Sequence, residues 1–264
     1  MTLELPPPPP PRSETPGAGP RGLAAVTWGG WQALAVFLLG NLVIAQLVVG
    51  TVVLIAMGVD VGEPIEGLPQ IAASVAADAA FLAVMLVWLR WRARDWPRRI
   101  GIRLGREGLR DAVIGAVSGL VLYGVIAFVI GVPLLALFRL VFGEGVVPPE
   151  QIPGHLSTNA KALTVFLALV LAPITEELFF RGILYRGVRD RHGVALGMIV
   201  SSVLFGATHL VQAPWRDALF LQTLMVFTGL GLATIYERRG NLVADIAAHT
   251  AFNVIGIVFI FAGR

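Results

Sequence analysis

Long apolar runs alternate with short polar connections along most of the chain. The seven runs cover residues 31–57, 70–88, 112–142, 162–180, 194–210, 219–236 and 242–261. Each holds roughly 17 or more residues with few charges, which is the length that an α-helix needs to cross the hydrocarbon core of a bilayer. We therefore predict an all-α fold, a polytopic transmembrane helical bundle of about seven spanning helices. The third run is long enough to tilt or to break near Pro133, and the fourth is expected to continue as helix to about residue 190.

Composition supports the same fold class. Of the 264 residues, 56% are hydrophobic and 14% are charged, whereas a soluble domain usually has about 25% charged residues. The chain contains no cysteine, which excludes disulfides, thiolate nucleophiles and cysteine-ligated metals. Many of the basic residues behind the net charge of +3 are arginines clustered in short connections, as topology signals are. The charge therefore indicates a lipid bilayer, and no nucleic acid, as a partner.

The pattern divides the chain into three parts. Residues 1–27 form a polar arm with six consecutive prolines. Such a segment buries too little apolar surface to fold, so we predict a disordered cytoplasmic arm. Residues 28–160 hold the N-terminal transmembrane helices and an arginine-rich cytoplasmic loop. Residues 161–264 hold the last four apolar runs and are expected to form the catalytic transmembrane core.

The charges of the connections predict the orientation in the membrane. The connection after the first run carries Asp60, Glu63 and Glu66 and no basic residue, whereas the connections after the second, fourth and sixth runs are rich in arginine. Short cytoplasmic loops carry the excess of Lys and Arg. The N-terminus is therefore expected in the cytoplasm and the C-terminus outside. The arginine bias and the lack of an endoplasmic-reticulum signal favour a prokaryotic plasma membrane.

A few polar side chains interrupt the last four runs. Glu176 and Glu177 are the only ionisable residues of the fourth run, His209 lies near the end of the fifth, and His249 and Asn253 lie one helical turn apart in the seventh. A charge in hydrocarbon costs about 3 kcal/mol, so such groups are expected to be paired, to face a wet cavity or to do chemistry. Glu176 and His209 are each roughly 16 residues from the turn between their runs, which predicts one common depth in the membrane. The arginine landmarks place His249 at that depth too.

The two glutamates are expected to differ in role. Glu177 and Arg181 are four residues apart with the acid first, which is the favourable order for an ion pair on one helix face. Glu176 points about 100° away from Glu177 and is left free to act as a general base on water. One or both histidines, with the asparagine, are then expected to stabilise a developing oxyanion.

Three motifs carry a resemblance to a known family. Residues 173–184 read Pro-x-x-Glu-Glu-x-x-Phe-Arg-Gly-x-Leu, residues 201–209 read Ser-Ser-x-x-Phe-Gly-x-x-His, and residues 249–253 read His-x-x-x-Asn. They resemble the EExxxR, FxxxH and HxxxN motifs of the CPBP family, which comprises CAAX prenyl proteases and the bacteriocin-processing enzymes of the Abi group. The resemblance covers about residues 160–255 and implies an intramembrane endopeptidase in which Glu176 activates water. The catalytic site that it implies consists of Glu176, Glu177, Arg181, His209, His249 and Asn253.

The resemblance leaves the cofactor open, because members of the family have been described both as metalloproteases and as glutamate-type enzymes. No HExxH sequence is present, so no single helix offers a two-histidine zinc clamp, and we expect that no cofactor is required. Zinc or another divalent metal is the alternative, because Glu176, His209 and His249 would together be an acceptable ligand set for a catalytic zinc.

Other functions stay open for the same residues. A proton-coupled transporter would use the acids as a relay, although we find no inverted repeat, and a proteolytically silent scaffold or immunity protein would keep the fold without the chemistry. The substrate is expected to be a membrane-associated protein or peptide, either of the prenylated CAAX type or a bacteriocin or leader peptide. Asp78 has no assigned role, and Asp245 is expected to stabilise the N-terminal end of its helix.

Overall fold

The structure is a computed structural model, and it describes residues 20–60, 65–149, 156–209, 211 and 213–262. Every regular element within these residues is helical. The α-helices are α1 (Gly30–Ala35), α2 (Thr51–Ala56), α3 (Gly67–Arg92), α4 (Trp96–Arg99), α5 (Gly105–Gly124), α6 (Val132–Phe142), α7 (Thr158–Phe166), α8 (Ala172–Glu177), α9 (Arg186–His192), α10 (Val194–Thr208), α11 (Trp215–Arg239) and α12 (Leu242–Ala262). The π-helical segments Val36–Gly50, Val125–Gly131, Leu167–Leu171 and Leu178–Tyr185 join successive α-helices into longer rods. The predicted all-α fold is confirmed.

Six continuous helices in the described part of the chain are long and apolar enough to cross a membrane. They are Gly30–Ala56, Gly67–Arg92, Gly105–Phe142, Thr158–His192, Trp215–Arg239 and Leu242–Phe259, and they correspond to six of the seven predicted runs. The remaining run forms α10, whose 15 residues extend for about 22 Å. This is less than the thickness of the hydrocarbon core, about 30 Å. His209 therefore follows the end of a short helix and does not lie inside a full span.

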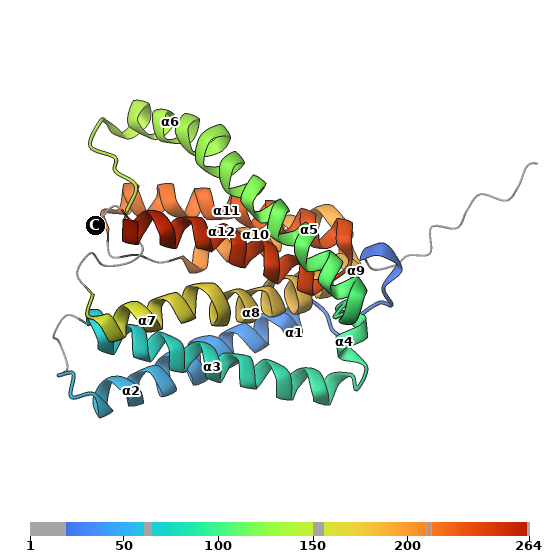
Figure 1. Cartoon of the computed structure of the whole chain (residues 1–264). Coiled ribbons are helices and arrows are strands. Elements are labelled where there is room, and N and C mark those ends of the chain that lie inside the picture. Colours follow the sequence, from blue (N-terminus) through green and yellow to red (C-terminus); the bar gives the residue numbers. More distant parts are fainter. Residues whose placement is uncertain (1–19, 61–64, 150–155, 210, 212, 263–264) are drawn as a thin grey trace, which may run out of the picture.

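The helices lie side by side with their connections at the two ends of a bundle (Figure 1). The end that holds α4 and α9 also holds the turn between α11 and α12, where Gly240 has a φ of 59°, the left-handed conformation that commonly ends a helix. The connections from α2 to α3 and from α6 to α7 lie at the other end (Figure 1). The arginine-rich connections thus share one end of the bundle. The predicted irregularity near Pro133 is present as the π-helical turn that directly precedes α6.

Two glycines allow α5 to pack closely against α12, the helix that carries His249. A Cβ atom on Gly119 would lie 2.0 Å from the carbonyl oxygen of Ala248, and one on Gly115 would lie 2.0 Å from that of Ala244. No side chain fits at either position, so the missing Cβ atoms set the distance between the helices, as small residues do in other membrane bundles. The N-terminal part of the chain therefore supports the predicted core directly.

The last residues of the predicted disordered arm, 20–27, are held against the bundle instead. The buried Arg186 donates a hydrogen bond to the carbonyl oxygen of Ala24 at 2.7 Å. Asp190 pairs with Arg186 at 2.9 Å and also accepts from the backbone N–H of Val26 at 3.0 Å. A buried charge needs such partners, so this ion pair fixes the chain just before α1. The rest of the predicted arm lies outside the described residues, and the division of the chain into three parts otherwise stays a prediction.

Replacing Gly119 by alanine should destabilise the protein, because the new methyl group would meet the backbone of α12, and overpacking of this kind typically costs about 1–3 kcal/mol. The same replacement at Gly124, at the end of the same helix, meets nothing within 4 Å. It should leave stability unchanged or raise it by up to about 1 kcal/mol, since alanine favours helix. Thermal unfolding of both purified variants in detergent measures the difference, and equal midpoints would contradict the close packing.

Candidate active site

Glu177 is completely buried and forms the ion pair that the sequence predicts. Its Oε1 accepts a hydrogen bond from Arg181 at 2.9 Å, and Arg181 is itself only 1% exposed. Arg181 also donates to the carbonyl oxygen of Gly229 in α11 at 3.0 Å, and its guanidinium carbon lies 4.9 Å from the centre of the Phe205 ring in α10. Buried charges persist when they are paired and hydrogen-bonded. The arginine meets that requirement through contacts with α8, α10 and α11.

His249 makes a contact that the sequence analysis did not predict. Its Nδ1 lies 2.7 Å from Glu177 Oε1, across 72 positions of sequence. An ionised carboxylate can only accept, so Nδ1 carries the hydrogen. Nε2 is then left facing Glu176 Oε2 at 3.9 Å. A carboxylate behind an imidazole fixes the orientation of the ring and the tautomer, so Glu177 holds His249 as well as Arg181.

Asp245 joins the same buried cluster. It lies in the first turn of α12, as expected for an acid that stabilises a helix terminus. Its carboxylate, however, is fully buried and its Oδ2 lies 3.8 Å from Arg181 Nε. Asp245 therefore does more than stabilise the helix terminus that the sequence suggests, because its carboxylate also faces the buried guanidinium of Arg181.

His209 directly follows α10 and is held by the end of that helix. Its backbone N–H bonds to the carbonyl oxygen of Gly206 at 3.2 Å, and its ring Nδ1 lies 2.8 Å from the carbonyl oxygen of Phe205. Carbonyl groups in the last turn of a helix lack intrahelical donors and take them from elsewhere. Because a carbonyl only accepts, Nδ1 of His209 carries the hydrogen, and Nε2 is the atom that remains to meet a ligand.

The fourth span is hydrogen-bonded to α12 next to a proline. Pro173 has no N–H, so the carbonyl one turn earlier loses its donor, at Leu169 in an α-helical register or at Ala168 in a π-helical one. Both carbonyls accept from α12 instead, Leu169 from Thr250 Oγ1 at 3.1 Å and Ala168 from Asn253 Nδ2 at 2.8 Å. Asn253 therefore joins two helices through one of its N–H groups and keeps a second N–H available.

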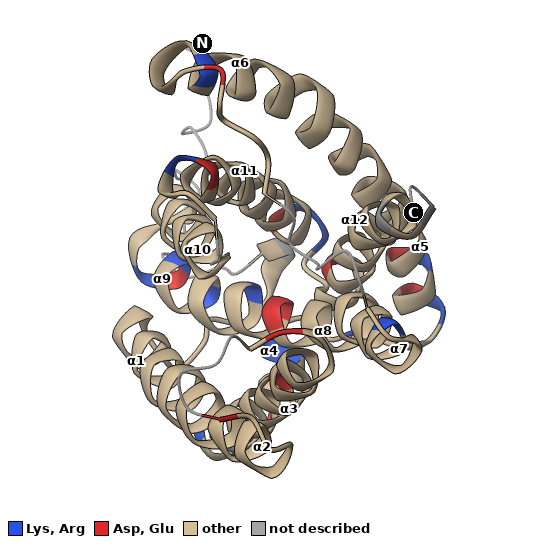
Figure 2. Ribbon diagram, turned by 90° about the vertical axis from the view of Figure 1, so that its left-hand side faces the viewer, with Lys and Arg blue, Asp and Glu red and all other residues tan. Residues whose placement is uncertain are grey.

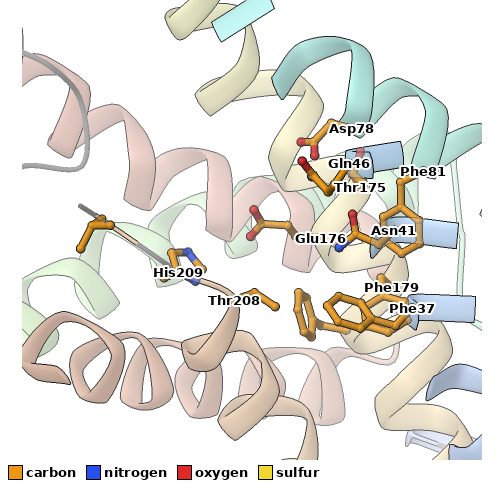
Figure 3. Close-up of a pocket in the computed structure, with 12 residues that line it drawn as sticks. Phe37, Asn41, Gln46, Asp78, Phe81, Thr175, Glu176, Phe179, Thr208 and His209 are labelled. Atoms are coloured by element: carbon orange, nitrogen blue, oxygen red, sulfur yellow. The ribbon is translucent and has the colours of Figure 1, made fainter. Parts of the chain in front are cut away.

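Two cavities meet at Glu176. The apolar cavity, of about 480 Å³, is lined by Tyr123, Leu224, Met225 and Phe252 and extends to His249 and Asn253. The polar cavity, of about 290 Å³, is lined by Asn41 and Gln46 of the π-helical segment after α1, by Asp78 of α3 and by Thr175 of α8. Among the described residues, Glu176 and His209 are the two that line both cavities. Figure 3 shows His209 and Asp78 on different sides of the Glu176 carboxylate.

The arrangement brings the six sequence-predicted site residues to one region inside the ring of helices, where charged positions gather around α8 (Figure 2). Glu176 has a side chain that is 28% exposed, whereas that of Glu177 is 0% exposed, so only the first of the two is accessible from a cavity. The sequence analysis missed the parts played by Asp245 and Thr250. An acid and a hydroxyl on the helix of a candidate histidine were the available signals for them.

Comparisons with known proteins agree with the motifs. The family model described as "Type II CAAX prenyl endopeptidase Rce1-like" matches residues 158–255. An uncharacterized 24.3 kDa protein of Escherichia coli is 31% identical over 180 residues, which are 67% of this chain and 75% of that relative. The chain belongs to the Rce1-like family of type II CAAX prenyl endopeptidases.

Two further bacterial relatives match shorter regions of this Rce1-like chain. An uncharacterized protein of Mycoplasma capricolum is 29% identical over 149 residues, 53% of this chain and 43% of the relative. The protein named "Putative membrane peptidase YdiL" of Bacillus subtilis is 26% identical over 102 residues, 38% of each chain. No solved structure matches. The resemblance to the CPBP family is confirmed, and with its apolar helices the Rce1-like chain is an integral membrane protein of a protease family.

The metal question depends on how the ligand candidates are arranged. Within the described part of the Rce1-like chain, no three His, Asp or Glu side chains lie close enough together to hold a metal ion. His249 and His209 each have Nδ1 engaged by an acceptor, so only the two Nε2 atoms are left as nitrogen ligands. The alternative ligand set of Glu176, His209 and His249 is therefore not assembled as a three-ligand centre among the described residues.

Replacing Arg181 by methionine should destabilise the protein by about 3–5 kcal/mol, because breaking a buried pair leaves uncompensated charge, here on Glu177 and Asp245. Arg238, an exposed residue near the end of α11, offers a matched control, and its replacement by methionine should change stability by no more than about 0.5 kcal/mol. Denaturant unfolding in detergent measures both variants. If the two unfold alike, Arg181 does not neutralise the buried acids.

Proposed function

We propose that this protein hydrolyses a peptide bond of a membrane-associated protein or peptide, with Glu176 as the general base that activates water. The observation that carries the proposal is the position of its carboxylate where the two cavities meet, with Oε2 3.9 Å from His249 Nε2. This buried oxygen has no hydrogen-bond partner among the described residues. Membership of a protease family supplies the reaction class.

The gap beside Glu176 suits a water molecule. A separation of 3.9 Å is too long for a direct hydrogen bond, but one bridging water can span it. As the water oxygen bonds to the carbonyl carbon of the substrate, Glu176 takes one proton from it. Glu176 passes that proton to the leaving nitrogen when the C–N bond breaks and returns to its starting state. Nε2 of His209, on the same stretch of cavity wall, accepts a hydrogen bond from the water and orients it.

The negative charge that develops on the substrate oxygen needs donors. His249 supplies one in the doubly protonated form of its ring, in which Nδ1–H donates to Glu177 and Nε2–H points away from the buried cluster. The second N–H of Asn253 supplies another, since both residues line the apolar cavity. Glu177 and Arg181 act in this proposal as positioning residues, which hold His249 without touching the substrate.

The substrate has an apolar part next to the scissile bond. The walls of the apolar cavity, among them Tyr123, Leu224 and Phe252, favour a hydrocarbon group over a polar one. A prenylated CAAX-type protein and a bacteriocin or leader peptide with apolar side chains both offer such a group. The proposal therefore includes both classes and requires no cofactor.

The proposed orientation follows the positive-inside rule, with the N-terminus in the cytoplasm of a prokaryotic cell and the C-terminus outside. The chain contains no cysteine, so single cysteines can report sidedness without background. Cysteines at Asp60 and at Arg98, in connections at opposite ends of the bundle, should be labelled from opposite sides by an impermeant maleimide. Labelling of Asp60→Cys from the cytoplasmic side would contradict the proposed orientation and indicate the opposite one.

Replacing Glu176 by glutamine should abolish cleavage while the protein stays folded, because the amide has the shape of the acid but cannot take a proton. The loss of a general base typically lowers the rate about 10²–10⁴-fold. Membranes that contain the wild type or the variant are compared by mass spectrometry of new peptide termini. Termini that depend on the wild type identify the substrate.

Glu107→Gln, at an exposed position in the first turn of α5, provides the matched control and should cleave as the wild type does. The cleavage assay repeated with a chelator addresses the metal, and we expect turnover to persist. Full turnover by Glu176→Gln would contradict the proposed base. Rescue of a cellular phenotype by Glu176→Gln without cleavage would favour a silent scaffold or immunity protein, and Glu176-dependent uptake into proteoliposomes would favour a transporter.

A further inference from the structure

The proposed mechanism leaves the polar cavity without a role. A substrate whose scissile bond lies at Glu176 has one side in the apolar cavity, because Glu176 and His209 line both spaces. The other side of the substrate is then adjacent to the polar cavity. Its walls include Asn41, Gln46 and Asp78, which is an unusual concentration of polar groups for the middle of membrane helices. These groups point to a ligand with matching chemistry.

Thr175 supplies an independent indication. Three other threonines in the membrane helices donate their hydroxyl to the carbonyl four residues earlier, Thr164 at 2.8 Å, Thr228 at 3.1 Å and Thr234 at 2.8 Å. Thr175 is only 2% exposed and lines the polar cavity, yet its Oγ1 has no hydrogen-bond partner among the described residues. A buried hydroxyl without a partner loses the hydrogen bonds that it would make with water and is therefore unfavourable. Its partner is therefore expected from the cavity.

Asp78 sets the charge of the ligand. It lies near the middle of α3, and no hydrogen bond or ion pair between described residues involves its carboxylate. Figure 3 shows it beside Gln46 and Thr175 at the wall of the cavity. An ionised carboxylate only accepts hydrogen bonds, so it takes an N–H donor or a cation. The described lining includes no Lys or Arg that could neutralise it.

The same charge disfavours a negatively charged ligand. Two like charges a short distance apart repel each other, and more strongly where water is partly excluded. Asp78 and Glu176 both line the polar cavity. A substrate residue with a carboxylate side chain next to the scissile bond is therefore a poor fit for this space. A chain that continues with an N–H-bearing side chain is a good one.

We propose that the polar cavity is a substrate subsite in which Asp78, with the hydroxyl of Thr175, binds a Lys, Arg or amide side chain of the substrate next to the scissile bond. The inference rests on the proposed function and narrows its substrate class from any apolar membrane peptide to one with a hydrogen-bond-donating residue on the side away from the apolar cavity. The subsite selects by charge, whereas the apolar cavity selects by hydrocarbon surface.

A peptide library tests the subsite. Lipid-anchored peptides that carry Arg, Gln, Leu or Glu at each of the positions after an apolar segment are incubated with the purified full-length protein in phosphatidylcholine nanodiscs, and mass spectrometry gives the cut positions and rates. The wild type should cut Arg and Gln peptides faster than Leu and Glu peptides. Asp78→Asn should reduce kcat/KM for the Arg peptide roughly ten- to a hundredfold, as expected for the loss of a charged hydrogen bond. Turnover of the Leu peptide should stay the same.

Ser74→Ala provides the matched control, since Ser74 lies one turn before Asp78 on α3 and its hydroxyl already donates to the carbonyl oxygen of Gln70 at 3.0 Å. Thr175→Val should weaken the Arg and Gln preference, and Thr175→Ser, which keeps the hydroxyl, should restore it. These two variants test the subsite even if Asp78→Asn fails to fold.

The outcomes separate the subsite from the proposed function. Cleavage of the library with the same residue preference in the wild type, Asp78→Asn and Thr175→Val would overturn the subsite and leave the protease in place. A wild type that cuts Glu peptides as fast as Arg peptides would do the same. A wild type that cuts no peptide, with no Glu176-dependent termini in membranes, would overturn both.

Discussion

The buried guanidinium of Arg181 is the constraint on which the rest of the core depends. A cation in the middle of an apolar bundle is stable only with anionic partners and acceptors on every side. Glu177, Asp245 and the Gly229 carbonyl supply them from α8, α12 and α11. Because these partners come from separate helices, satisfying one charge fixes the mutual positions of the elements that surround it. The acid that neutralises the cation also accepts from His249, so the same ion pair orients an imidazole that faces Glu176.

A second constraint comes from a backbone N–H group that is missing in the fourth span. Pro173 removes a donor from the fourth span, and the carbonyl groups left near it are satisfied by Thr250 and Asn253. In hydrocarbon, where no water replaces a lost hydrogen bond, an unsatisfied carbonyl is unfavourable by several kcal/mol. The proline therefore requires a polar helix face beside it. These bonds attach α12 to the fourth span about two helical turns before the two glutamates and complement the contact of Glu177 with His249 further along the same span.

The sequence predicts the parts of this arrangement that follow from periodicity and counting. Apolar runs identify the helices, and equal distances from a turn bring Glu176 and His209 to one depth. The contact between Glu177 and His249 was beyond that reasoning, because the i,i+4 rule applies within one helix and the 100° step between neighbours assumes regular α-helix. The π-helical Leu178–Tyr185 changes that step immediately after the glutamates. The contacts of residues 20–27 were not predicted, because their partner Arg186 lies among the arginines that the sequence analysis interpreted only as topology signals.

Adjacent acids on one helix point in different directions and cannot both face the same surroundings. Glu176 and Glu177 therefore have different roles. Glu177 points to Arg181 and is closed off, so its charge is permanently committed to the core. Glu176 points to the junction of the cavities, where its buried oxygen has no described partner. If Glu176 were also paired inside the protein, it would be more stable there but unable to take a proton from water. A base in hydrocarbon therefore has to be left incompletely satisfied, and the stability lost at Glu176 has to be supplied by neighbours such as Glu177, whose Oε1 accepts from both Arg181 and His249.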